Sequence, residues 1–177
     1  MKQVTKLFFA AVMLFGLTAC AQSPKNNNNL SNNSTMKKTL IVYFSATGNT
    51  KRAAEKLAKE FNADLFEIVP AEPYTAADLD WRDKSSRSTI EMKDKTSRPA
   101  IAATCDNLGD YDTVWIGFPV WWYTAPTIIN TFIESHNFDG KVLNVFATSG
   151  GSGVEGSAAD LKKAYPQYRW GESRLMN

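Results

Sequence analysis

From residue 39 onward, runs of apolar residues alternate with stretches whose apolar positions recur at helical spacing. Continuous apolar and β-branched runs are typical of parallel strands that are covered on both faces. They predict four strands, at residues 39–44, 63–69, 112–118 and 141–148. The tail, residues 168–177, supplies at most a short fifth strand.

Apolar residues at helical spacing fill the intervals between these strands. They predict helices over residues 50–61 and 125–135, and a further helix that ends near Pro166. Thr124 is the expected N-cap of the second helix, and Pro126 is tolerated in its first turn.

Strands separated by helices imply right-handed crossovers and a mostly parallel sheet, so the sequence predicts an α/β fold. The polar interval at residues 76–95 is expected to form a surface helix or a long loop. The chain has 177 residues, of which 44% are hydrophobic and 12% aromatic, which is enough for one packed domain.

The first twenty residues follow a different pattern. Lys2 and Lys6 accompany a mostly apolar run, residues 7–17, that is too short to span a bilayer but suits the core of an export signal. The sequence LTAC that follows resembles a bacterial lipobox, which implies that Cys20 becomes lipidated. An ordinary cleaved signal with an incidental cysteine is the alternative.

An asparagine-rich stretch comes next, and it has almost nothing to bury. We therefore expect a lipoprotein signal peptide at residues 1–20, a tether at residues 21–36, and a folded domain at residues 37–177. This arrangement predicts a protein that is exported and anchored by lipid to a bacterial membrane. Met36 leaves a second possibility, because translation from that residue would give a cytoplasmic protein.

Charge and composition exclude several classes of function. The net charge is +2, and without Lys2 and Lys6 the basic and acidic residues balance. No basic stripe with interleaved aromatic residues indicates a nucleic-acid partner. No cluster of His, Cys, Asp and Glu indicates a metal site. Cys105 is expected to be a small buried residue, and His136, the single histidine, a surface or C-capping residue, so no catalytic residue is predicted.

The loop SATGNT, between the first strand and the first helix, is rich in hydrogen-bond donors. The start of a helix presents free backbone N–H groups and a positive dipole end. Ser45, Thr47 and Thr50 add hydroxyls, Asn49 adds an amide, and Gly48 lets the backbone come close. These features predict a phosphate site without a lysine, although a hydroxyl-rich helix cap is the plainer interpretation.

Two further loops are expected at the same edge of the sheet, where ligands of open α/β folds gather. One loop carries three successive aromatic residues, which indicates either a planar ligand that stacks on them or an aromatic cluster that closes the end of the core. The other is glycine-rich, so that backbone N–H groups can approach a ring. Together the three loops predict a ligand with a phosphate at one end and a flat polar ring at the other.

The segments YFSATGNTKRAAEKLA, GFPVWWYTAPTIINTFIE and DGKVLNVFATSGGSG, in this order, resemble the flavodoxin family. The resemblance covers residues 37–166 and implies a doubly wound, five-stranded parallel sheet of order 2-1-3-4-5 that binds FMN. The residues that match the family's cofactor loops are Ser45, Thr47, Gly48, Asn49 and Thr50 for the phosphate, Pro119, Val120, Trp121, Trp122 and Tyr123 beside the ring, and Ser149, Gly150, Gly151 and Gly153 at its polar edge.

The resemblance implies a redox protein that carries electrons between a donor and an acceptor, each a redox protein or a small molecule, with contact to a membrane only through the lipid anchor. Two alternatives stay open: an NAD(P)H-dependent quinone or flavin reductase on the same fold, and a flavin-free surface binding module. The near-neutral domain departs from the acidic surface of typical family members. The family's final helix is also expected to be absent, either because the sequence is truncated or because another subunit protects the last strand.

Overall fold

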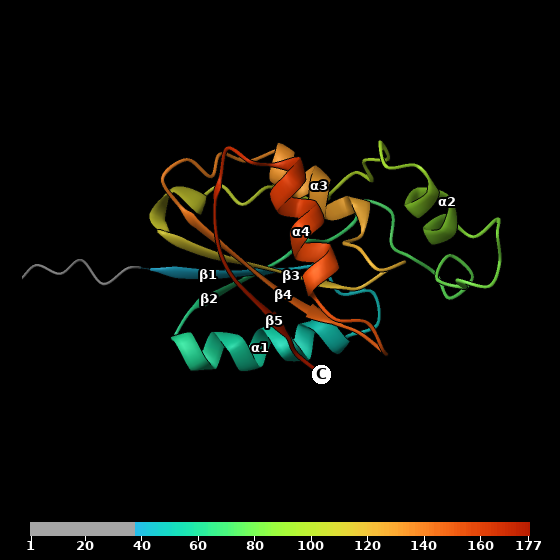
Figure 1. The fold of residues 1–177 in the computed structure, drawn as a ribbon, viewed down its shortest axis with the longest axis horizontal. Helices are drawn as coiled ribbons and strands as arrows, with labels where there is room; N and C mark the ends of the chain where they lie inside the picture. The colour runs from blue at the N-terminus through green and yellow to red at the C-terminus, as the bar shows by residue number, and fades with distance from the viewer. Residues whose placement is uncertain (1–37) are drawn as a thin grey trace, which may run out of the picture. The chain divides into compact units, whose positions relative to one another are not determined.

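Five parallel strands in the order β2-β1-β3-β4-β5 form the centre of the fold (Figure 1). A computed structural model describes residues 38–177; the predicted signal peptide, Cys20 and the tether lie outside the described residues and stay predictions. The α/β class and the strand order are confirmed. The strands are β1 (Thr39–Tyr43), β2 (Asp64–Glu67), β3 (Thr113–Pro119), β4 (Val142–Thr148) and β5 (Arg169–Leu175).

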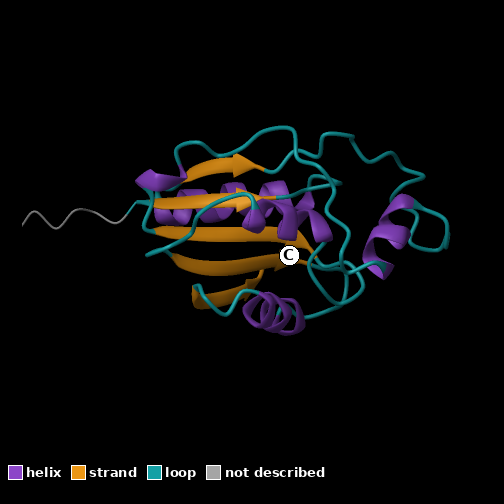
Figure 2. Ribbon diagram, turned by 90° about the horizontal axis from the view of Figure 1, so that it is seen from above, coloured by secondary structure: helices purple, strands orange, loops and turns teal. Residues whose placement is uncertain are grey.

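Helices cover both faces of the sheet. Helix α1 (Asn49–Phe61) lies on one face, and α3 (Thr127–Glu134) and α4 (Glu155–Ala164) lie on the other (Figures 1 and 2). The short helix α2 (Arg87–Lys93) stands apart from the sheet, and a 3-10 turn at Leu108–Asp110 precedes β3. Among residues 38–177, no helix has the length and apolar character needed to cross a membrane.

The core consists of two layers, one on each side of the sheet. Because successive side chains of a strand point to opposite faces, the continuous apolar run of β1 serves both layers. Leu40 and Val42 join the larger cluster beneath α3 and α4, whereas Ile41 and Tyr43 join the smaller cluster beneath α1. Both faces are therefore buried along the central strands, which is why their sequences lack alternation.

Gly117 of β3 has no side chain, and the ring of Phe146 occupies the space where one would lie. It lies in register with Phe146 of β4, whose side chain is fully buried. A Cβ added to Gly117 would collide with three carbons of the Phe146 ring. The glycine is therefore required here by packing and not by its backbone conformation.

The polar interval between β2 and β3 is an excursion from the sheet, residues 70–101, that contains α2. Pro70 and Ile101 form an antiparallel bridge at its neck. Two backbone hydrogen bonds flank the bridge, from Ala71 N to Ala100 O and from Ala102 N to Val69 O, both 2.8 Å. The prediction of a surface helix or a long loop is thus met by a long loop that holds one short helix.

Two local predictions differ from the structure. Pro126, and not Thr124, is the N-cap of α3, so the capping prediction was wrong; the Thr124 hydroxyl instead donates to Asp160 Oδ2 at 2.8 Å. The fifth strand is longer than expected, because β5 pairs with β4 over most of its length and Glu172 N donates to Asn144 Oδ1 at a bulge (2.7 Å).

Candidate functional site

The three predicted loops lie together at the carboxyl edge of the sheet. They follow β1, β3 and β4, which are neighbours in the sheet, so their ends meet at one place. A cavity of about 670 Å³, here called the three-loop cavity, opens between them. Of the predicted residues, it is lined by Thr47, Asn49, Pro119, Val120, Trp121, Ser149 and Gly150.

The first loop has the free donors that an anion requires. Within residues 38–177, the backbone N–H groups of residues 46–50 donate to no protein acceptor. Gly48 takes a left-handed conformation (φ 83°), which glycine adopts without steric cost, and as the N-cap of α1 it has no side chain to bond the first turn. The first turn of α1 also holds no acidic residue. The start of the helix therefore keeps its donors for a bound group.

The hydroxyls of the first loop are not equivalent. Ser45 Oγ accepts a hydrogen bond from Lys51 N at 3.1 Å, which closes the loop onto α1. Thr47 is exposed and lines the three-loop cavity. Thr50 is buried, and its hydroxyl lies 2.8 Å from that of Thr148 in β4. Thr47 is thus the threonine whose hydroxyl is freest to meet a ligand.

The second loop contains a strained aromatic turn. Trp121 and Thr124 exchange two backbone hydrogen bonds, both 3.0 Å long, around Trp122 and Tyr123. Both central residues have left-handed φ values, 46° and 68°, as in the type I′ turns that normally carry Asn and Gly. Such strain costs on the order of 1–3 kcal/mol per residue and persists mainly at functional sites.

Ser149, the first residue of the third loop, stabilises the conformation of that loop through its side chain. Ser149 Oγ accepts hydrogen bonds from the backbone N–H groups of Gly151 (3.2 Å) and Ser152 (2.7 Å). Gly150 and Gly151 face open space, so no side chain stands between their backbone and a ligand. Gly151 and Gly153 are exposed but lie outside the three-loop cavity.

A second hollow, of about 390 Å³, adjoins the first. We call it the aromatic pocket, because four aromatic side chains line it. The residues around it are Leu79, Trp81, Ser88, Val120, Trp121, Trp122, Tyr123 and Ser152. Val120 and Trp121 line both hollows.

The family model described as flavodoxin matches residues 38–177. The chain belongs to the flavodoxin family. No curated protein matches this flavodoxin.

Several solved structures are similar to this flavodoxin. A candidate flavoprotein from Bacteroides eggerthii is 57% identical over 78% of this chain and 87% of its own, with a TM-score of 0.77. A second candidate flavoprotein, from Bacteroides uniformis, is 53% identical over 78% and 89% of the two chains, with the same TM-score, 0.77. A Lactobacillus acidophilus flavoprotein solved in complex with FMN is 26% identical over 79% of this chain and 93% of its own, with a TM-score of 0.68.

Aromatic, hydrogen-bond and cation–π contacts hold the side chain of Trp121 in place. The Trp121 ring packs edge-to-face against Phe44 (5.6 Å between ring centroids) and against Tyr74 (5.5 Å). The Tyr74 hydroxyl donates to Glu91, and the Arg87 guanidinium lies 4.1 Å from the centre of the Tyr74 ring. Burial and the Glu91 hydrogen bond raise the pKa of Tyr74, so its hydroxyl stays protonated at neutral pH. The excursion is thereby tied to the second loop.

Several residues at the site were not predicted from the sequence. Arg52 and Lys56, one helical turn apart on α1, bring positive charge to the three-loop cavity, and Arg52 contacts the Asn49 amide oxygen. Their spacing from Asn49 places them on one side of the helix, which was the signal available. Trp81 and Ser88 belong to the excursion, where no periodic pattern connected them to the loops.

Cys105 and His136, for which the sequence predicted no catalytic role, lie away from the three loops. Cys105 is buried, and burial raises the pKa of its thiol. His136 follows α3: its Nε2 accepts from Cys105 N (2.9 Å), and its Nδ1 lies 2.8 Å from Phe132 O, a carbonyl in the last turn of the helix. The C-capping prediction is therefore confirmed. No group of His, Cys, Asp and Glu within residues 38–177 could hold a metal.

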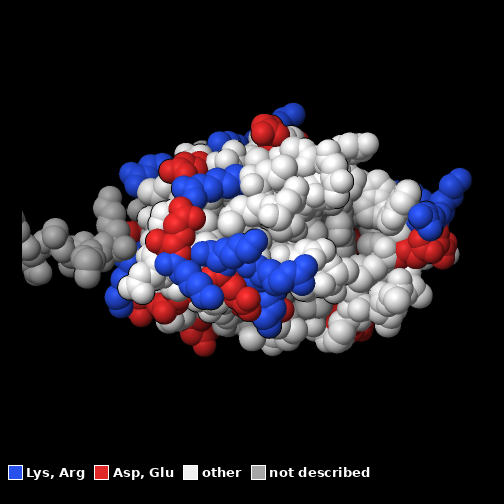
Figure 3. All heavy atoms as spheres, turned by 90° about the horizontal axis from the view of Figure 1, so that it is seen from below, with Lys and Arg blue, Asp and Glu red and all other residues white. Residues whose placement is uncertain are grey.

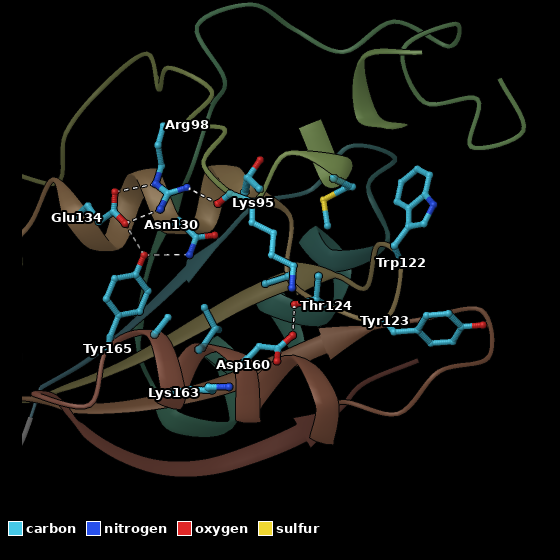
Figure 4. Close-up of a pocket in the computed structure, with 15 residues that line it drawn as sticks. Lys95, Arg98, Trp122, Tyr123, Thr124, Asn130, Glu134, Asp160, Lys163 and Tyr165 are labelled. Atoms are coloured by element: carbon cyan, nitrogen blue, oxygen red, sulfur yellow. Dashed lines mark hydrogen bonds and ion pairs between the residues drawn. The ribbon is translucent and has the colours of Figure 1, made fainter. Parts of the chain in front are cut away.

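A third hollow, of about 650 Å³, lies between α3, α4 and the end of the excursion (Figure 4). Trp122 and Tyr123 stand at one end of it, and a polar network stands at the other. In that network Arg98 binds the Glu134 carboxylate twice, at 2.7 and 2.8 Å, and the Tyr165 hydroxyl donates to Glu134 at 2.7 Å. The network ties the excursion to α3 and α4.

This network predicts an acid-sensitive contribution to stability. Hydrogen bonds from Arg98 and then Tyr165 hold the pKa of Glu134 below its ordinary value of 4.5. The ionised carboxylate therefore stabilises the fold above that pH, and the contribution is lost as the pH falls through the folded-state pKa. Because the pair is partly exposed, we expect Glu134→Gln to reduce the acid-induced loss of unfolding free energy by less than about 1 kcal/mol. Urea unfolding of both proteins at neutral and acid pH measures this difference, and identical pH profiles would contradict it.

Proposed function

We propose that this flavodoxin binds FMN in the three-loop cavity and carries electrons between a donor and an acceptor. The observation that carries the proposal is the row of free backbone donors at the start of α1, within a cavity that all three loops share. The FMN bound by the related Lactobacillus acidophilus flavoprotein supports the choice of ligand.

The first loop fits the phosphate of FMN. Free N–H groups of residues 46–50 and the Thr47 hydroxyl supply hydrogen bonds, and the positive end of the α1 dipole favours an anion. Arg52 and Lys56 add positive charge to the same cavity, which the sequence alone did not suggest. The donor set therefore matches a dianion better than a neutral ligand.

The other two loops fit a flat ring. Trp121 offers an aromatic side chain that Phe44 and Tyr74 hold in place, and Pro119 and Val120 add apolar surface. Ser149 and Gly150 line the same cavity, where Ser149 N donates to Asn177 Oδ1 at 3.1 Å. When bound, FMN supplies the electron chemistry, while these residues orient its ring and exclude water.

The α1 face of the domain shows no field of a single sign that would favour a strongly charged redox partner. Seen from the α1 side, Lys and Arg side chains mix with Asp and Glu side chains over one part of the surface, and a broad area beside them is uncharged (Figure 3). A field of a single sign would steer a partner protein of opposite charge, and this face offers none. A small-molecule donor or acceptor places no such demand on the surface.

Titration with FMN tests the proposal directly. We expect one FMN to bind per chain, with quenching of flavin fluorescence and a coloured protein after excess flavin is removed. Reductive titration of that complex, followed by its visible spectrum, then shows whether the bound flavin accepts electrons. A folded protein that stays colourless would contradict the proposal and would favour the flavin-free binding module.

A further inference from the structure

Strand β5 is one of the two edges of the sheet, and within residues 38–177 no strand pairs with its outer side. It has seven residues, and Gly171, Glu172, Ser173 and Leu175 are exposed. An edge strand presents a row of backbone N–H and C=O groups to which a further strand can pair. The outer side of β5 is therefore a candidate interaction surface.

The hydrogen bonds to β4 show which backbone groups of β5 point outward. Glu172 N donates to a β4 side chain (2.7 Å), and Met176 N donates to a β4 carbonyl (2.8 Å). Because the direction of the backbone groups alternates along a strand, Arg174 also turns its N–H toward β4, whereas Ser173 and Leu175 turn theirs outward. Ser173 lies at the middle of the exposed stretch, so its N–H and C=O are the central groups on the outer side.

One side chain of α4 reaches the backbone of this stretch. Lys162 Nζ lies 3.4 Å from Gly171 O. A carbonyl oxygen accepts two hydrogen bonds, so this long contact leaves the oxygen able to accept from a neighbouring strand.

Two antiparallel copies of β5 have one register that suits both the backbone and the charges. With Ser173 on the two-fold axis, the Ser173 residues of the two copies face each other, and their outward groups form two hydrogen bonds. The same register places Glu172 opposite the partner's Arg174, and symmetry repeats this pair. Moving the axis to residue 171 or 175 loses both pairs of opposite charge.

The two charged side chains can bind more than they bind within one chain. Arg174 donates to Glu172 through Nε (3.2 Å) and one terminal nitrogen (3.0 Å), both to Oε2, and to Glu60 through the other (2.8 Å). A guanidinium has five N–H donors, so two remain. Within residues 38–177, Glu172 Oε1 accepts no hydrogen bond, and the Glu172 side chain is 66% exposed. The partner's Arg174 can therefore bind Oε1 without breaking the contacts inside each chain.

The other edge of the sheet is less suited to pairing. Strand β2 has only four residues, and just beyond its end Val69 O accepts from Ala102 N (2.8 Å), a residue at the neck of the excursion. The strand begins with Asp64 and ends with Glu67, which would face each other in an antiparallel pair of two β2 strands. Like charges directly opposite each other are destabilising, so β5 is the edge that favours self-association.

We propose that two copies of this chain pair through β5, antiparallel about Ser173, so that their sheets join into one. The partner is a second copy because β5 is complementary to itself: each copy supplies both the Glu172 and the Arg174 that the other requires. The inference goes beyond the proposed function and does not depend on it, since residues 172–174 do not line the three-loop cavity.

Sedimentation equilibrium of the full chain tests the pairing, and we expect a monomer–dimer equilibrium. Ser173→Pro removes the outward N–H from both copies and should raise the dimer Kd roughly 5- to 150-fold, as the loss of two hydrogen bonds predicts. The fold should persist, because proline is tolerated where the N–H faces away from the sheet. Ser173→Ala is the matched control: it keeps the N–H and should leave the Kd unchanged. A parent chain that stays monomeric, or a dimer on which the two variants have the same effect, would overturn the pairing.

Mixing two charge variants tests the register. Glu172→Arg brings two arginines together in each contact of the dimer, and Arg174→Glu brings two glutamates together, so each variant alone should associate more weakly than the parent. An equimolar mixture should form a heterodimer, since every contact then joins opposite charges. A change that acts only within its own chain cannot be reversed by mixing. A mixture that associates no better than its components would overturn the register, and urea unfolding of each variant shows that it is folded.

Discussion

Replacing Gly117 by alanine is expected to lower the free energy of unfolding by about 1–3 kcal/mol, with the result near the upper end of that range. The added methyl group would collide with the ring of Phe146, which is fully buried in the cluster beneath α1. Neither partner can move easily, because β3 and β4 pair in register along their whole length at the centre of the sheet. Urea unfolding measures the loss as a lower midpoint.

Two further variants show whether the collision is the cause. Gly109→Ala is the control, since a Cβ at Gly109 meets no atom within 4 Å, and it should leave the midpoint nearly unchanged. The double variant Gly117→Ala with Phe146→Leu replaces the ring by a smaller side chain and should be more stable than the sum of the two single changes predicts. If the Gly117→Ala protein were as stable as the parent, the Phe146 ring would be able to move away from the added methyl group. The predicted collision would then be wrong.

Thr47→Val is expected to weaken FMN binding roughly 10- to 150-fold, the value of one hydrogen bond to a charged group. Valine keeps the shape of threonine and removes its hydroxyl, which lines the three-loop cavity. Thr50 is the poorer choice, because its hydroxyl pairs with Thr148 in the core, so that a change there would also affect stability. Titration followed by flavin fluorescence measures the affinity.

Riboflavin separates the phosphate from the ring in this experiment. It lacks the phosphate, so its affinity should be the same for the Thr47→Val variant and the parent protein. Thr104→Val, at an exposed threonine remote from the three loops, should leave both flavins unaffected. If riboflavin and FMN lost affinity equally, Thr47 would act on the ring or on the loop conformation, and the phosphate assignment would be wrong.

The sheet was predictable because its signal is local and strong. Each central strand is buried on both faces, so a continuous apolar run marks it without any knowledge of its neighbours. The family's three loop motifs follow β1, β3 and β4 directly, which is why the loops could be placed at one edge. The edge strands were less well predicted: β2 is shorter than expected and β5 is longer, since their side chains are largely exposed.

The part of the aromatic pocket that the excursion forms could not be predicted from the sequence, because it depends on tertiary contacts. Trp81 and Ser88 lie in a polar segment without periodicity, and the neck, the Tyr74 contacts and the Arg98–Glu134 pair hold that segment against the rest of the domain. The Thr124 prediction failed for a similar reason. A threonine before a helix usually caps it, but here Thr124 closes the turn with Trp121, and the helix starts later.

The neck of the excursion also makes the strand register of the sheet independent of the chain beyond the neck. Since Pro70 and Ile101 already meet across the bridge, the chain between them begins and ends at one point, whatever its length or composition. We expect insertions and deletions within it to leave the strand register undisturbed, because loop length changes closure entropy only slowly. The exposed parts of the excursion can therefore vary more freely than Tyr74 and Arg98, which hold Trp121 and Glu134 of the domain in place.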